Sequence, residues 1–408
     1  MAKAKRIFWD TAAGFNNPAS IHREGLMAEK AVEEARSKIA EVLQAHPDEI
    51  IFTGSGTESD NLAILGLAEA VGVRPDVRKT TSGSLEVAFL TSGKSKPGHI
   101  ITTAIEHKAV LEPCRHLQRK GFRVTYLKVD KTGQVDLKEL KESLTKDTFL
   151  VSVMMANNEI GTIQPIREIA KIIRQFRKAN PSTTLGAGLP YFHTDACQAP
   201  RFLDLNVAKL GVDLLAFNGS KIYGPQGVGV LYVRRGVLLA PIILGGGQEK
   251  GLRSGTLNVE GIVGLAKALT NCEKERVKES ARLEKIQKKL ITELQKIPGV
   301  TINGGLENRL PNNINFSVDN LEGEQLVLEL DAKGFAVSSG SACSHDSGEG
   351  SYAIRAIGGF DKLTTSGLED RATSAVRVSL PREVSLSDVT YFIKSLKEII
   401  TKYNKINL

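Results

Sequence analysis

Lys221 and Asp195 are the residues of this chain whose types and setting could support the most specific chemistry. Lys221 lies in the run Asn218–Pro225, and Asp195 lies shortly upstream in His193–Gln198. A lysine that can link to an aldehyde and a carboxylate that can pair with a pyridinium nitrogen are what catalysis by pyridoxal 5'-phosphate (PLP) requires. Most lysines are solvated charges, and an Asp after an apolar strand is often a helix cap. The pair alone therefore suggests a PLP site without establishing one.

The sequence around Lys221 predicts that it lies where a buried strand ends. Leu214–Phe217 is a short apolar run, and the glycines after Lys221 turn the chain into a second run at Val228–Val233. Folds of the α/β class place their chemistry at such strand ends. The local pattern therefore favours the PLP interpretation.

A glycine-rich run, Phe52–Asn61, passes from a predicted strand through a turn into a helix. Backbone N–H groups around Gly56, aided by the Thr57 hydroxyl, suit a phosphate group at such a helix start. Many turns between a strand and a helix are glycine-rich, so the run is weak on its own. Beside Lys221 it supplies the phosphate site that PLP needs.

Three further features have both a functional and a structural interpretation. His107 opens a helix after a strand, where a capping or surface histidine is more common than a catalytic one. Gly245–Thr256 contains three consecutive glycines, which indicate either close backbone approach or a plain linker. Arg377 lies in a strand-like run, where its partner could be a substrate carboxylate or a buried acid.

The four cysteines are scattered, with no C-x-x-C pair and no His/Cys cluster at metal-ligand spacing. Neither a disulfide framework nor a metal site is expected. Cys114 and Cys272 fall in helix-like segments and are expected to be packed or incidental thiols. Cys343 lies in the polar, glycine-rich run Ser338–Gly350, which we expect to be mobile and to leave the thiol exposed. Such a thiol is either incidental or a nucleophile.

Composition describes an ordinary globular protein. The 408 residues are 41% hydrophobic and 25% charged, and no apolar run approaches the length of a membrane span. With no signal-peptide core near Met1, a cytoplasmic location is expected. The net charge of +8 could attract an acidic protein or RNA. Because lysines alternate with acids and no aromatic-basic platform occurs, direct nucleic-acid binding is not expected.

Hydrophobic patterning predicts an α/β fold in two domains. Apolar runs alternate with helical patterns between about residues 50 and 235, which indicates a mostly parallel sheet with helices on both faces. A long amphipathic stretch then leads to two short strands, Asn313–Val318 and Ala375–Ser379, and a final helix. We predict a large domain over residues 1–257 and a smaller α+β domain over 258–408.

Two segments are predicted to be surface insertions. Val71–Gly98 is rich in Lys, Arg, Ser, Thr and Gly and could contain a hairpin around Leu85–Leu90. Asn180–Pro190 carries Pro, Gly and Thr without periodicity. Both are expected to be loops.

Together these motifs resemble the cysteine desulfurases, PLP-dependent enzymes of fold type I in the class V aminotransferase group. The similarity runs from Trp9 to about Arg382 and adds Asn17–His22 and Asn157–Gly161 to the segments above. So many motifs in one order are highly specific. The Ser-Ser-Gly-Ser-Ala-Cys run ending at Cys343 resembles the subgroup that serves iron–sulfur cluster assembly and tRNA thiolation. The resemblance implies a seven-stranded-type sheet and allows the extreme N-terminus to pack on the small domain.

The resemblance implies that L-cysteine is converted to L-alanine while its sulfur forms a persulfide on Cys343 for a sulfur-acceptor protein. Lys221 would bind PLP and move the Cα proton, Asp195 would pair with the pyridinium nitrogen, and His107 would stack on the ring. Arg377 would bind the cysteine carboxylate.

The resemblance also implies a set of binding residues and a homodimer in which one of them comes from the second subunit. Gln198 and Asn158 would contact the ring oxygen or its surroundings, and Asn158 would also face the substrate. The phosphate would be held by residues from three segments: Gly56 and Thr57, Asn218 and Ser220, and Thr256 of the second subunit.

Three departures from the family pattern bear on these expectations. The family usually has Ser-x-His-Lys at the lysine, whereas Asn218 and Ser220 take those places here. Both can donate hydrogen bonds, so we expect the protein to retain PLP binding. Any effect of the two replacements would be a weaker affinity for PLP. The segment before Asn17 is shorter than usual in the family, which affects the expected geometry of the substrate entrance and of the dimer. Val71–Gly98 and Gly358–Thr373 are longer than usual, which affects the surface expected to dock the sulfur acceptor.

Two other kinds of function compete with a desulfurase. A selenocysteine lyase or a transaminase of the same fold is the nearest enzyme alternative, and a transaminase would not need Cys343. A PLP-binding scaffold with reduced activity is the alternative from another class, suggested by Ser220. Turnover of L-cysteine by the pure protein would eliminate the scaffold.

Overall fold

Seven strands form the central sheet of the protein. The computed structural model describes residues 17–72, 74–79, 85–90, 98–181, 189–340, 350–358 and 368–406. The strand order is β1-β9-β8-β7-β6-β4-β5, and β9 runs antiparallel to both neighbours while the other pairs are parallel. Their bounds are β1 Ile50–Thr53, β4 His99–Thr103, β5 Arg123–Leu127, β6 Thr148–Ser152, β7 Tyr191–Asp195, β8 Leu214–Asn218 and β9 Gly229–Val233. The predicted mostly parallel sheet is confirmed.

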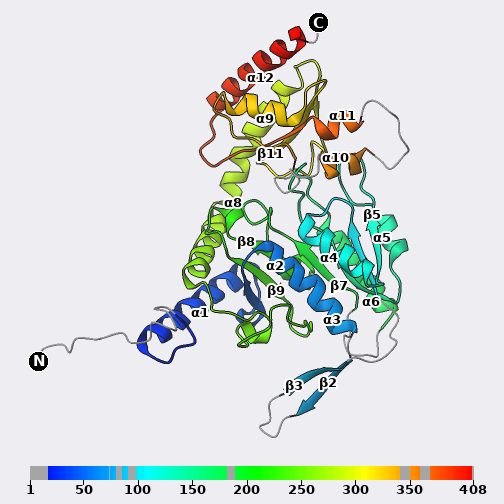
Figure 1. Ribbon diagram of the computed structural model, residues 1–408, viewed down its shortest axis with the longest axis vertical. Helices are drawn as coiled ribbons and strands as arrows, with labels where there is room; N and C mark the ends of the chain where they lie inside the picture. Colours follow the sequence, from blue (N-terminus) through cyan, green and yellow to red (C-terminus); the bar gives the residue numbers. More distant parts are fainter. Residues whose placement is uncertain are drawn as a thin grey trace, which may run out of the picture.

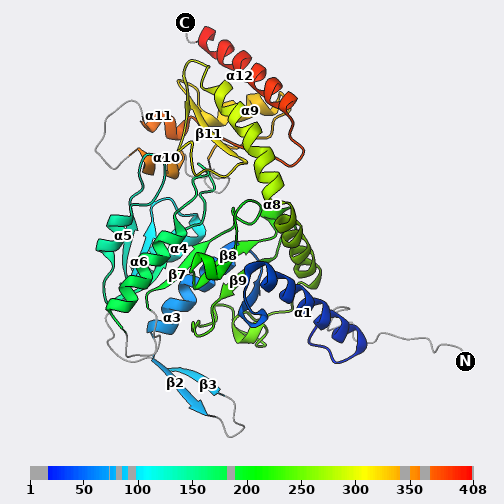
Figure 2. The same ribbon diagram turned by 180° about the vertical axis from the view of Figure 1, so that it is seen from behind.

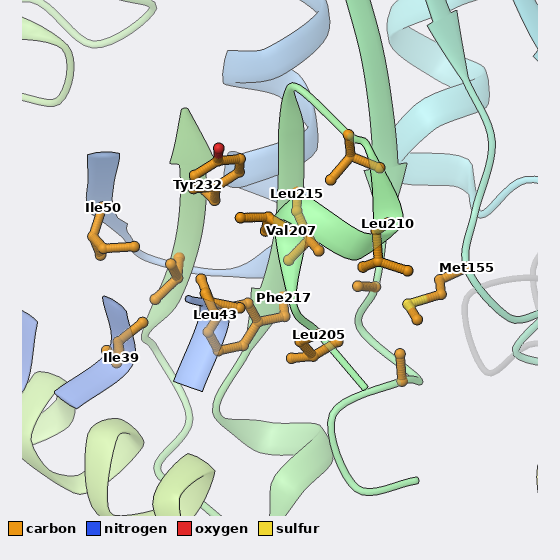
Figure 3. Close-up of a cluster of buried hydrophobic side chains, with 14 of the residues drawn as sticks. Ile39, Leu43, Ile50, Met155, Leu205, Val207, Leu210, Leu215, Phe217 and Tyr232 are labelled. Atoms are coloured by element: carbon orange, nitrogen blue, oxygen red, sulfur yellow. The ribbon is translucent and has the colours of Figure 1, made fainter. Parts of the chain in front are cut away.

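Helices cover both faces of this sheet because its strands carry apolar side chains on both sides. In β8, Leu215 and Phe217 face one hydrophobic cluster, and Leu214 and Ala216 face another. Figure 3 shows the first cluster, in which residues of α1, β8 and β9 pack together. The helices are α1 Arg23–Leu43, α2 Gly56–Asn61, α3 Leu67–Gly72, α4 Lys108–Arg119, α5 Leu137–Ser143, α6 Ile166–Ala179 and α7 Val207–Leu210.

Short helical turns complete the large body. A π-helical turn, η2 (Leu62–Gly66), joins α2 to α3 without a break, so one helical rod runs from Gly56 to Gly72. The 3-10 turns are η1 Pro47–Glu49, η3 Ser220–Ile222 and η4 Glu249–Gly251.

A smaller body is built on the antiparallel sheet β10-β11-β12, with bounds Val300–Ile302, Asn313–Val318 and Ala375–Ser379. Around it lie α9 Gly323–Asp331, α10 Tyr352–Ile357, α11 Leu368–Thr373 and α12 Leu386–Ile406. The long helix α8, Val259–Leu294, links the two bodies in Figures 1 and 2 and packs with both α1 and α12. Because α8 contributes to both, a domain boundary between residues 257 and 258 stays a prediction.

The hairpin predicted within Val71–Gly98 is present. Strands β2 (Arg74–Lys79) and β3 (Leu85–Leu90) pair antiparallel. Figures 1 and 2 show the hairpin projecting from the end of the molecule opposite the small body. Among the described residues no helix is long and apolar enough to cross a membrane.

Candidate active site

The carboxyl ends of five strands that run in the same direction meet at one edge of the central sheet. Each of these strands ends at, or leads through a short segment to, residues singled out in the sequence: β1 to Gly56 and Thr57, β4 to His107, β6 to Asn158, β7 to Asp195 through Gln198, and β8 to Asn218 through Lys221. Such an edge is where open α/β sheets bind ligands. The expectation that Lys221 lies just beyond a strand end is confirmed.

Lys221 sits in the turn η3, directly after β8, with an exposed side chain. Its backbone N–H donates to the Oδ1 atom of Asn218 at 3.3 Å, which fixes the turn. Asp195 is the last residue of β7 and is 6% exposed. One of its oxygens accepts the backbone N–H of Cys197 at 2.8 Å.

His107 lies close enough to Asp195 and Lys221 for both charges to act on it. Burial lowers the pKa of His107, Asp195 opposes this, and Lys221 and Lys108 add to the lowering. Its Nδ1 atom also accepts the N–H of Ala109 at 3.1 Å, capping α4. The capping interpretation is therefore confirmed, the lowered pKa favours the neutral imidazole, and the catalytic interpretation stays a prediction.

The helix start after β1 forms a cradle that leaves no room for a side chain at its first residue. A Cβ atom on Gly56 would lie 2.5 Å from Cys197 Sγ and 3.0 Å from Asn218 Nδ2. The Ser55 side chain accepts the N–H of Glu58 at 3.1 Å, and the Thr57 side chain is exposed. Beside the cradle a pocket of about 590 Å³ is lined by Thr57, Asn61, Leu65, residues 107–109, Glu112, Pro113, His116 and Arg119.

Hydrogen bonds orient the side chain of Asn218 toward this cradle. Its Oδ1 atom accepts from the Ser220 hydroxyl and from the N–H of Lys221, each at 3.3 Å. The carbonyl of the amide is therefore engaged, and the Nδ2 donor is the end that lies near Gly56. The residues that replace the usual Ser and His thus present a donor to the cradle.

Arg377 comes from the small body and reaches the large one. It lies in β12, as predicted, and its Nη1 atom donates to the backbone oxygen of Asn158 at 3.0 Å. Its backbone pairs with Ser338 through two hydrogen bonds of 2.7 and 3.2 Å. Gln198, after β7, is half-buried. Cys343 lies outside the described residues, between Gly340 and Gly350.

The glycine-rich segment Gly245–Thr256 is held in place by buried contacts, which disagrees with a plain linker. Glu249 accepts from Arg36 at 2.7 and 3.0 Å and from the N–H of Phe52 at 2.7 Å. Arg253 pairs with Glu58 at 2.8 Å. The segment ends at Thr256, whose exposed side chain lines a second pocket of about 540 Å³.

Sequence reasoning missed a buried group of ionisable side chains behind Asp195. Asp60 in α2 and His193 in β7 are almost fully buried, and Asp60 Oδ1 lies 3.4 Å from His193 Nε2. Burial raises the pKa of Asp60 well above its ordinary value, and burial lowers the pKa of His193 to about 3. Burial also raises the pKa of Glu106 to about 8. Asp60 and His193 stand inside the quoted motifs, but only the fold brings them together.

The three described cysteines are held as neutral thiols. Burial raises the pKa of Cys114 to about 12 and raises those of Cys272 and Cys197 above the ordinary value. Cys114 and Cys272 are packed, as predicted. A thiol is nucleophilic in its ionised form, so none of these three is suited to attack a sulfur atom.

The residues at this edge fit PLP. A lysine follows β8, a buried carboxylate ends β7, a histidine lies close enough to both for their charges to act on it, and a tightly packed glycine opens the helix after β1. These are the groups that PLP requires for its covalent link, its ring nitrogen, its ring face and its phosphate. No cluster of three or more His, Cys, Asp or Glu suited to a metal occurs among the described residues. Fold and site together define a PLP-dependent enzyme.

Comparison with known proteins agrees with this class. A family model described as aminotransferase class V matches residues 5–78 and 77–392. The cysteine desulfurase IscS of Dictyoglomus turgidum is 44% identical over 96% of this chain and 89% of its own length. A mitosomal cysteine desulfurase of Trachipleistophora hominis is 42% identical over 95% of this chain and 82% of its own. A solved NifS-like protein superposes with a TM-score of 0.79 at 37% identity, covering 94% of this chain and 91% of that one.

The chain belongs to the class V aminotransferase family, a family of PLP-dependent enzymes, and within it to the group of the cysteine desulfurases. The resemblance inferred from the sequence motifs is thereby confirmed, as is the fold expected from it.

Proposed function

We propose that this protein converts L-cysteine to L-alanine and retains the sulfur as a persulfide on Cys343. In this step the Cβ–S bond of the substrate breaks, and an S–S bond forms between its sulfur and Cys343 Sγ. The hydrogen lost from the Cys343 thiol is balanced by the new C–H bond of alanine. The sulfur then passes to an acceptor that serves iron–sulfur cluster assembly or tRNA thiolation. PLP, when bound, supplies the electron sink that makes the substrate Cα–H bond acidic.

Each residue at the sheet edge has a role in this proposal. Lys221 would hold PLP and carry the Cα proton, and the buried carboxylate of Asp195 would keep the ring nitrogen protonated. His107 would stack on the ring and, as a neutral imidazole, would accept the substrate thiol proton. Arg377 binds the substrate carboxylate with its planar guanidinium. Gln198 supports the ring oxygen from the β7 side.

The phosphate is proposed to sit in the cradle at Gly56 and Thr57. The Asn218 amide nitrogen, held toward this cradle by Ser220 and Lys221, replaces the donor that the family usually takes from serine. Thr256 of the partner subunit completes the phosphate contacts.

One observation supports a sulfur reaction more than any other. Lys221, Asp195 and His107 meet at one edge of the sheet, while the pKa values of the three described cysteines are all raised, which keeps them as neutral thiols. The chain has four cysteines in total. Cys343 is therefore the residue left to act as the nucleophile.

A homodimer is proposed from large apolar side chains that are exposed in this chain. Ile21 is 93% exposed and Leu244 is 80% exposed, and exposed apolar side chains that gather on a surface mark an interface. Leu26 and Met27 on α1 are also exposed. Light scattering coupled to size exclusion tests this point, and a monomeric mass at micromolar concentration would contradict it.

The persulfide is tested directly by mass spectrometry. After incubation with L-cysteine and without reductant, the peptide that contains Cys343 should gain one sulfur atom, and the peptide that contains Cys197 should not. Sulfur on Cys197 instead would contradict the proposal. Unmodified peptides with alanine still released would favour a lyase or a transaminase, and PLP binding without turnover would favour a scaffold.

A further inference from the structure

The start of the short helix α10 of the small body is hydrogen-bonded to the segment that follows β6. Figures 1 and 2 show α10 on the side of the small body that faces the large one. Its N-cap residue, Ser351, accepts the N–H of Ile354 at 3.1 Å and donates its hydroxyl to the carboxylate of Glu159. The next residue, Tyr352, places its hydroxyl 3.4 Å from the Oδ1 atom of Asn158. Two neighbouring residues at the start of α10 therefore form hydrogen bonds with two neighbouring residues of the large body.

This contact determines which end of the Asn158 amide remains available. A primary amide has one acceptor oxygen and two N–H donors. The Tyr352 hydroxyl is an O–H donor to that oxygen, because burial raises the pKa of this phenol and the nearby Glu159, Glu106 and Asp195 raise it further. The backbone oxygen of Asn158 is already engaged by Arg377. What remains are the Nδ2 donors, next to the groups that the proposed function assigns to PLP and to the cysteine carboxylate.

The charge environment of Tyr352 places it at the same site. Asp195, Glu106 and Glu159 all act on its hydroxyl, although Asp195 belongs to β7, Glu106 to the segment after β4 and Glu159 to the segment after β6. The phenol thus lies near acidic groups from three segments that meet at this edge of the sheet, beside its contact with Asn158.

We propose that Tyr352 is a positioning residue of the active site, which holds the Asn158 amide so that its N–H donors face the ring oxygen of PLP or the substrate carboxylate. This inference rests on the proposed function and adds a residue that the sequence motifs did not indicate. Tyr352 acts through Asn158, and it couples the small body, which carries Arg377, to the residue beside the cofactor.

The test compares Tyr352→Phe with a matched variant, Tyr403→Phe, in the holoenzyme. Tyr403 also lies in the small body and also makes a hydroxyl contact, 2.8 Å from Glu329 Oε1. Removing the Tyr352 hydroxyl should raise KM for L-cysteine roughly 3- to 10-fold, the range expected for one neutral hydrogen bond. It should also change the visible absorption spectrum of bound PLP at fixed pH. Tyr403→Phe should change neither.

The same substitution in a protein that lacks the Asn158 amide shows whether Tyr352 acts through Asn158. In an Asn158→Ala protein, adding Tyr352→Phe should have no further effect on KM or on the spectrum. Equal effects of Tyr352→Phe in both backgrounds, or an unchanged spectrum in the single variant, would overturn the inference. The spectrum is recorded without turnover, so it decides the role of Tyr352 even if the protein released no alanine. A protein that bound no PLP would overturn both proposals.

Discussion

The guanidinium of Arg36 in α1 donates hydrogen bonds of 2.7 and 3.0 Å to the two carboxylate oxygens of Glu249. Both residues are 7% exposed, and Glu249 also accepts the N–H of Phe52 from β1. Arg36 further donates to the backbone oxygen of Ile50 and lies 4.7 Å from the Phe52 ring centroid. The pair therefore holds the segment that ends at Thr256 against the first strand of the sheet.

Breaking this pair on one side is predicted to be strongly destabilising. Arg36→Met leaves the Glu249 carboxylate buried without its cation, which costs about 3–5 kcal/mol of unfolding free energy. Replacing both residues with apolar ones should recover most of the loss. Urea denaturation measures both variants. Arg235→Met, which removes an exposed pair with Asp48, is the control and should change stability little. A similarly small loss for Arg36→Met would show that the buried pair is not essential.

Stability should depend on pH through Glu106, a buried carboxyl group whose pKa is raised by burial to about 8 from 4.5. Between these two values the unfolded chain is ionised while the folded protein keeps the proton. The wild type therefore loses about 1.4 kcal/mol of stability for each pH unit crossed as pH rises through this window. Glu106→Gln lacks the titration, so its stability relative to the wild type should rise from pH 5 to about 8. A constant difference over that range would refute the assignment.

A methyl group at Gly56 is predicted to weaken PLP binding. The added Cβ would lie 2.5 Å from Cys197 Sγ, and overpacking of this kind costs about 1–3 kcal/mol. Fluorescence titration of the apoprotein with PLP should show a Kd for Gly56→Ala that is roughly tenfold higher or more. Adding Cys197→Ala removes the nearest atom and should restore part of the affinity. No recovery in the double variant would mean that the clash lies elsewhere.

The amide nitrogen of Asn218 is predicted to be a phosphate donor. Asn218→Asp keeps the shape but replaces the donor with an acceptor and a negative charge. A hydrogen bond to a charged group is worth about 1.5–3 kcal/mol, so PLP should bind at least roughly tenfold more weakly. Asn218→Ser should bind PLP about as well as the wild type. Equal affinities for the Asp and Ser variants would contradict this role.

Much of the fold and part of the site were predictable because their patterns are local. The predicted strands Asn313–Val318 and Ala375–Ser379 match the structure residue for residue, because a short run of alternating apolar residues bounded by turns is a local property of the sequence. Asp195 ends a strand, and Lys221 and His107 come shortly after strands, so their convergence followed from the expected parallel sheet.

Contacts between distant residues could not be predicted in this way. Arg36 and Glu249 are 213 positions apart, and an arginine within a charged helix such as α1 resembles a solvated side chain. Tyr352 stands in a short helix with no periodic pattern, between segments rich in glycine and serine. Its partner, Asn158, is supplied by the other body of the protein. Only tertiary packing reveals such pairs.

The most direct test of the proposed activity is the alanine released from L-cysteine by the wild type, Cys343→Ala and Lys221→Ala, each with PLP and a thiol reductant. We predict multiple turnovers by the wild type and losses of roughly 100-fold or more in both variants. Alanine at the wild-type rate from Cys343→Ala would contradict the persulfide route. No alanine from the wild type, with PLP bound, would contradict the desulfurase activity itself.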